Sequence, residues 1–239
     1  MNYFKHIFFT TILLVATVVL FQFTDLDIEV ENFFYNFQTH KWLVDENNKL
    51  LDLIFYSGIK KVLVAFGLSL LFILIFLRNK PLFKPYKKGL LVVVLSFIFI
   101  PLIVGGLKDI TNTPCPNDLK IYGGEYPDIK VLTPYPPNSP LKCKNVRCWP
   151  AGHASGGFAL MALFFLFKSK KNKLLALSLG LSVGWSMGLY KMFVGDHFLS
   201  HTIVTMLFAY LIMFIIARLI YGDEYPTLNK TCYNNNSNQ

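Results

Sequence analysis

The apolar residues of this chain gather in runs of helical length, separated by short polar segments. Six runs can be distinguished, at residues 7–23, 62–77, 90–107, 153–167, 174–190 and 202–220. A helix needs about 17–25 apolar residues to cross a bilayer. Each run is near that length, although 153–167 must tilt or recruit flanking residues. The pattern therefore predicts an all-α integral membrane bundle of six transmembrane helices with a long irregular periplasmic loop.

The composition supports a membrane class. Hydrophobic residues make up 54% of the 239 positions and charged residues only 15%, whereas soluble domains average about 25% charged. A soluble fold is excluded because six such runs leave too little polar surface to cover them. The first run is followed by bulky residues rather than a small-residue cleavage site, so we expect a retained helix and not a cleaved signal peptide. We expect one domain over residues 1–228 and a disordered, asparagine-rich tail at 229–239.

Two short basic loops predict the topology. The cations of these loops are Arg78, Lys80, Lys84, Lys87 and Lys88 in one, and Lys168, Lys170, Lys171 and Lys173 in the other. Short loops rich in Lys and Arg stay in the cytoplasm. Both termini are then cytoplasmic, and residues 24–61, 108–152 and 194–201 lie outside. The net charge of +9 follows mostly from these loops, so it does not indicate nucleic-acid binding.

The long outer segment 111–150 is rich in proline and glycine, so regular structure is not expected there, and a loop of this length is usually functional or disordered. It holds Cys115, Cys143 and Cys148, and a disulfide is stable in an oxidising compartment. We expect a Cys143–Cys148 bridge because the two are near in sequence, although Cys115 can compete and spacing does not settle connectivity. The aromatic-rich residues 25–60 are expected along the outer interface.

Ionisable residues lie at the outer ends of the predicted helices. Lys108 ends the third run, His153 opens the fourth after Gly152, and Lys191, His197 and His201 lie between the fifth and the sixth. Such groups at the edge of membrane helices are functional candidates. Two cations suit a multiply charged anion, and a helix N-terminus at Gly152 binds phosphate through its free N–H groups. Histidine can transfer protons near neutral pH and can attack phosphorus, so one His would attack while another protonates the leaving oxygen.

Three sequence blocks carry a family resemblance. KDITNTPCP starts at Lys108, PAGH ends at His153, and YKMFVGDHFLSH ends at His201. In order and spacing they are similar to the K-x6-R-P, P-S-G-H and S-R-x5-H-x3-D blocks of the type-2 phosphatidic acid phosphatase superfamily, over roughly residues 90–220. The resemblance implies a membrane lipid phosphatase that needs no metal or other cofactor, in which His197 is the phosphorylated nucleophile and His153 the general acid. The positions that it assigns to phosphate binding are Lys108, Lys191, Gly152, Ala151 and Cys115.

Four departures from the family pattern change residues of the expected site. Ala151 replaces a serine and Cys115 an arginine, while Lys191 replaces an arginine and so offers a point charge instead of a fork. His201 replaces the aspartate that orients the nucleophile. His201 lies one helical turn beyond His197 and can accept its N–H if neutral, so we expect it to orient the nucleophile, with Asp196 ranked second. Reduced or altered activity is expected.

Three other functions are compatible with these residues. Cys115, His153, His197 and His201 have ligand types suited to zinc, although Lys108 and Lys191 would repel a dication. A non-catalytic lipid-phosphate binder or transporter would keep the lysines without needing the histidine nucleophile. A lipid phosphotransferase would share the phosphohistidine step.

The expected partner is a phosphorylated lipid in the bilayer. The stretch DLDIEVENFFYNF, which starts at Asp25, is similar to lipid A phosphatases of the superfamily. We expect hydrolysis of a lipid phosphate monoester or pyrophosphate, with lipid A, undecaprenyl pyrophosphate and phospholipid phosphates as candidates. The site should face the periplasm from a bacterial inner membrane.

Overall fold

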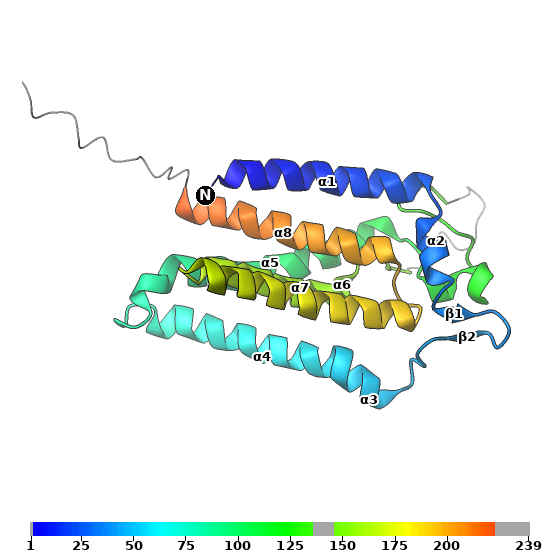
Figure 1. Ribbon diagram of the computed structural model, residues 1–239, viewed down its shortest axis with the longest axis horizontal. Helices are drawn as coiled ribbons and strands as arrows, with labels where there is room; N and C mark the ends of the chain where they lie inside the picture. Colours follow the sequence, from blue (N-terminus) through cyan, green and yellow to red (C-terminus); the bar gives the residue numbers. More distant parts are fainter. Residues whose placement is uncertain (1, 136–145, 223–239) are drawn as a thin grey trace, which may run out of the picture.

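The computed structural model describes residues 2–135 and 146–222 (Figure 1). These residues are mostly helical, with one two-stranded hairpin. The predicted apolar runs lie in α1 (Tyr3–Phe23), α4 (Gly58–Phe72) with its π-helical extension η2 (Ile73–Leu77), α5 (Lys87–Thr111), α6 (Gly152–Ala159) with the 3-10 helix η7 (Leu160–Phe165), α7 (Lys170–Phe193) and α8 (Leu199–Tyr221). The prediction of a helical fold is confirmed, while the proposed tail at 229–239 lies outside the described residues.

Four helical segments of the described residues are long and apolar enough to cross a membrane. They are Tyr3–Phe23, Lys49–Leu77, Lys84–Asp118 and Leu199–Tyr221. The segment Gly152–Phe165 is apolar but shorter, and α7 opens with the sequence KKNK and is interrupted by glycines and serines. Length and composition therefore support four spans, and six crossings stay a prediction.

The long helices lie side by side in one bundle, with α1 against α8 and α6 against α7 (Figure 1). The described N-terminus lies beside the final turn of α8. The opposite end carries α2 (Leu26–Glu31), the hairpin of β1 (Tyr35–Asn36) and β2 (Lys41–Trp42), and α3 (Lys49–Asp52). We call this the loop end, because the connection from α5 to α6 also lies there.

Glycines allow α6 and α7 to pack in direct backbone contact. A Cβ added at Gly157 would lie 2.7 Å from the Cα of Gly184, and one added at Gly184 would overlap the ring of Phe158. In a membrane, where lipid is as apolar as leucine, such small residues let helices associate through close packing. This contact fixes α6, which begins at the candidate site, against the helix that carries Lys191.

The start of α8 is held by a carboxylate from α2. Asp27 accepts hydrogen bonds from the backbone N–H of Ser200 at 2.8 Å and from its hydroxyl at 2.5 Å. A carboxylate suits this place because the first N–H groups of a helix have no intrahelical partner and carry partial positive charge. Burial raises the pKa of Asp27 to about 6, although both bonds to Ser200 oppose the rise. The segment that contains Asp27 therefore positions the first turn of α8, which carries His201.

The described part of segment 111–150 has more structure than the sequence indicates. It contains the 3-10 helices η4 (Pro116–Asp118) and η5 (Lys120–Tyr122). Leu119, Tyr122 and Tyr126 pack with Tyr35 of the hairpin and Phe198 in one buried cluster. The expectation of an irregular loop was therefore too simple, because aromatic contacts from distant parts of the chain order it.

Candidate functional site

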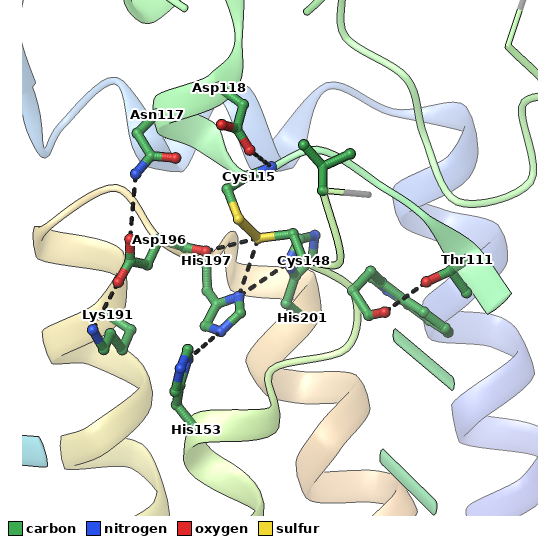
Figure 2. The surroundings of a disulfide bond; sticks show 12 residues. Thr111, Cys115, Asn117, Asp118, Cys148, His153, Lys191, Asp196, His197 and His201 are labelled. Carbon is green, nitrogen blue, oxygen red and sulfur yellow. Dashed lines mark hydrogen bonds and ion pairs between the residues drawn. A yellow bond between two sulfur atoms is a disulfide. The ribbon is translucent and has the colours of Figure 1, made fainter. Parts of the chain in front are cut away.

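The predicted site residues converge at the loop end of the bundle, where α6 begins and α8 follows α7 (Figure 2). His153 is the second residue of α6, Lys191 lies in the last turn of α7, and His197 lies in the turn that leads to α8. Lys108 reaches them from the last turn of α5. A Cβ added at Gly152 would lie 3.3 Å from Cε of Lys108 and 3.5 Å from its Nζ, so the glycine gives the lysine room beside the N-terminus of α6.

The two histidines of the predicted reaction are in direct contact. Nδ1 of His153 lies 2.8 Å from Nε2 of His197, and Figure 2 shows the two rings facing each other. One of these nitrogens must carry the hydrogen, because two bare lone pairs cannot approach so closely. His197 is only 1% exposed, and burial, followed by the nearby histidines and lysines, lowers its pKa well below the ordinary value. A neutral ring retains the lone pair that a nucleophile needs.

The other nitrogen of His197 faces the protein interior. Its Nδ1 lies 3.5 Å from Nδ1 of His201 and 3.4 Å from Sγ of Cys148. His201 is therefore placed where the sequence predicted an orienting group, at the long end of hydrogen-bond range. Asp196, the second-ranked orienter, instead accepts from Lys191 at 2.7 Å and from the side-chain amide of Asn117 at 3.3 Å.

The cysteine pairing differs from the prediction. Cys148 forms a disulfide with Cys115, 33 positions earlier, so the expected Cys143–Cys148 bridge is wrong; Cys143 itself lies outside the described residues. Proximity in sequence was misleading because hydrogen bonds bring the residues after α5 next to the residues before α6. The N–H of Cys148 donates to the carbonyl of Thr113 at 3.0 Å, and the Thr111 hydroxyl donates to the carbonyl of Trp149 at 2.7 Å.

The disulfide also bears on the zinc alternative. Cys148, His197 and His201 bring ligand atoms within 4.8 Å of one another. A metal binds the thiolate form of cysteine, however, and the sulfurs of Cys115 and Cys148 are bonded to each other. In this oxidised form the cluster offers two imidazoles and no thiolate.

Two further predicted positions have defined environments. Ala151 is fully buried, and its N–H donates to the carbonyl of His201 at 3.2 Å, which ties the start of α6 to α8. Cys115 reaches the site through its disulfide, and its N–H donates to a carboxylate oxygen of Asp118 at 3.0 Å. The assignment of Ala151 and Cys115 to phosphate binding stays a prediction, as do the roles of the other site residues.

Sequence reasoning missed two side chains from the second span. Tyr56, in the π-helical turn η1 (Leu53–Ser57), meets His153 edge to face with ring centroids 4.9 Å apart, and Nζ of Lys191 lies 4.5 Å from its ring centroid. Lys60 of α4 lines a cavity of about 340 Å³ together with Tyr56, Gly152 and His153. The sequence offered one signal for them, the four-residue spacing of Tyr56 and Lys60, which puts both side chains on one helix face.

The sequence of this chain is similar to those of known proteins. The chain is 25% identical over 211 residues to a lipid A 4'-phosphatase of Francisella tularensis subsp. novicida (strain U112), covering 87% of this chain and 92% of the relative. No solved structure matches the chain significantly. The model of the PAP2 superfamily matches residues 89–224, a region that includes all the predicted site residues. The chain therefore belongs to the PAP2 superfamily, the type-2 phosphatidic acid phosphatases.

Proposed function

We propose that this protein is a multi-pass membrane phosphatase that hydrolyses a phosphate monoester of a lipid, with lipid A as the first candidate. Family membership supports a phosphatase, and the relative named as a lipid A 4'-phosphatase supports the lipid class. The observation that carries the proposal is the 2.8 Å contact between His153 and His197, with Lys108 and Lys191 close by.

The proposed reaction has two steps. Nε2 of His197 bonds to phosphorus while the bond from phosphorus to the lipid oxygen breaks, and the imidazolium form of His153 protonates that leaving oxygen and becomes neutral. Water then attacks the phosphohistidine, giving its proton to His153, and the phosphorus–nitrogen bond breaks to release inorganic phosphate. Lys108, Lys191 and the N-terminus of α6 at Gly152 stabilise the charge on the phosphoryl oxygens. No metal ion takes part in either step.

The proposed orientation places the site outside the cytoplasm, at the periplasmic face of a bacterial inner membrane. Supporting it, the two lysine-rich loops lie at the end of the bundle opposite the loop end (Figure 1), as the positive-inside rule requires for a six-span topology with both termini inside. The aromatic segment 25–60 would then lie at the outer membrane interface.

The test is release of phosphate from lipid A by the purified full-length protein, in the presence of a chelator. The matched variants are His197→Asn and His40→Asn, the latter in the hairpin and with a positive φ of 53° that asparagine tolerates. We expect His197→Asn to lose essentially all turnover and His40→Asn to keep it. Wild-type turnover by His197→Asn would refute the phosphohistidine mechanism.

The same assay separates the alternatives. A binder or transporter would retain the lipid phosphate without releasing inorganic phosphate, and a phosphotransferase would give a newly phosphorylated acceptor lipid. Loss of turnover with chelator, restored by zinc, would favour a metal site.

A further inference from the structure

The charges around the two histidines do not balance a phosphate dianion. Lys108 and Lys191 contribute two positive charges, and Asp196 removes one through its 2.7 Å ion pair with Lys191. A phosphate monoester carries about −1.5 to −2 at pH 7. The charges that surround the histidines therefore leave part of the phosphate charge unmatched until His153 is protonated, and a further cation at the site would strengthen phosphate binding.

Lys60 is a cation in the right place. It lines the same cavity as Gly152 and His153, and its Nζ lies 5.8 Å from the centroid of the Tyr56 ring. The same ring has Nζ of Lys191 at 4.5 Å. Tyr56 is thus close to both lysines and lies against His153, and its ring attracts both ammonium groups through its quadrupole.

The position of Lys60 in its helix needs an explanation. It is an exposed residue near the start of α4, just before the uncharged apolar run that begins at Val62. Within residues 2–135 and 146–222 it makes no ion pair with a carboxylate. An ionisable side chain at the edge of a membrane helix that lines a cavity is a candidate for ligand binding. The ligand that the neighbouring His153 indicates is an anion.

We infer that Lys60 binds an oxygen of the lipid phosphate from the membrane side of the site, and that Tyr56 positions Lys60 and Lys191 for it. This inference rests on the proposed function. Beyond Lys60 the cavity is lined by apolar residues of α4 and α5, including Leu63, Phe97 and Pro101, so Lys60 lies where a polar headgroup would meet the hydrocarbon part of its lipid.

The test compares Lys60→Met, Lys60→Arg and the neighbouring control Lys61→Met in the full-length protein. A hydrogen bond to a charged group contributes about 1.5–3 kcal/mol, so Lys60→Met should raise KM for the lipid phosphate about tenfold or more, with kcat little changed. Lys60→Arg should recover most of the affinity, and Lys61→Met should resemble the wild type. Equal KM values for Lys60→Met and Lys61→Met would overturn the inference. If Lys60→Met is not monodisperse, Lys60→Gln replaces it.

Tyr56 needs its own comparison, because its argued contribution is the ring and not the hydroxyl. Tyr56→Phe should keep KM near the wild-type value, whereas Tyr56→Leu should raise it as Lys60→Met does. If Tyr56→Phe and Tyr56→Leu have the same KM, Tyr56 does not position the lysines.

A second readout does not depend on turnover. Inorganic phosphate should raise the thermal unfolding temperature of the wild type and Lys61→Met, and raise it less for Lys60→Met. A protein that hydrolyses no lipid phosphate but shows this pattern would refute the proposed function and keep the Lys60 site. A short-chain phosphate monoester, assayed beside the lipid in micelles, shows whether Lys60 recognises the phosphate itself. If Lys60→Met raises KM for the lipid but not for the short-chain monoester, Lys60 does not bind the phosphate.

Discussion

Removing the Cys115–Cys148 disulfide should destabilise the loop end substantially. The bond joins residues 33 positions apart, and the chain-entropy relation assigns such a loop about 3.7 kcal/mol at 25 °C. For a domain of this size, that corresponds to a fall in the unfolding temperature of about 7–15 °C. A bridge between positions 143 and 148 would close a five-residue loop, for which the same relation gives only about 2 kcal/mol.

The assay is thermal unfolding in detergent of the wild type, Cys115→Ser/Cys148→Ser and Cys143→Ser, each with and without a reductant. The double variant should unfold at the lower temperature and be insensitive to reductant, while Cys143→Ser should follow the wild type. Peptide mapping without reduction identifies the linked pair independently. The reasoning fails if the Cys143→Ser variant shows the large loss, or if the wild type carries free thiols at Cys115 and Cys148.

The remaining predictions concern a buried acid and a packed glycine. Glu31 is fully buried, with neither carboxylate oxygen hydrogen-bonded in the described structure, and burial raises its pKa from 4.5 to about 9. The folded state therefore holds a proton that the unfolded state releases between these pH values, so stability falls as pH rises through that window, by up to about 1.4 kcal/mol per pH unit. Glu31→Gln should remove this fall, and parallel unfolding curves for both proteins from pH 5 to 9 would contradict the assignment. Gly184→Ala should cost about 1–3 kcal/mol because its methyl overlaps Phe158. Gly105 lies within α5, where an added Cβ meets nothing within 4 Å, and Gly105→Ala should raise the unfolding temperature slightly because alanine is favoured over glycine inside a helix.

The helices and the polar end of the site could be predicted because their signals are local. Apolar runs indicate helices directly, and the four-residue spacing of His197 and His201 places both rings on one side of a turn. Lys108 and His153 could be predicted to meet because topology puts both helix ends on one side of the membrane. These inferences use only span order and periodicity.

The missed features depend on contacts that span the fold. The Cys115–Cys148 bond requires the two ends of a long connection to run side by side, which spacing does not reveal. Tyr56 and Lys60 precede the apolar run as read from the sequence, so they were assigned to the outer interface. Only the packing of η1 and α4 against the other helices shows that Tyr56 meets His153 and that Lys60 lines the same cavity.

The contact between His153 and His197 has a consequence for how a phosphoryl group enters and leaves the site. Each ring serves as the other's hydrogen-bond partner, so the two nitrogens satisfy each other. An incoming phosphoryl group must take the place of this bond, which is worth about 1 kcal/mol net, and the bond re-forms when phosphate leaves. The two rings therefore compete with inorganic phosphate for the same space, which favours release of a small product over that of a lipid substrate held also by its hydrocarbon chains.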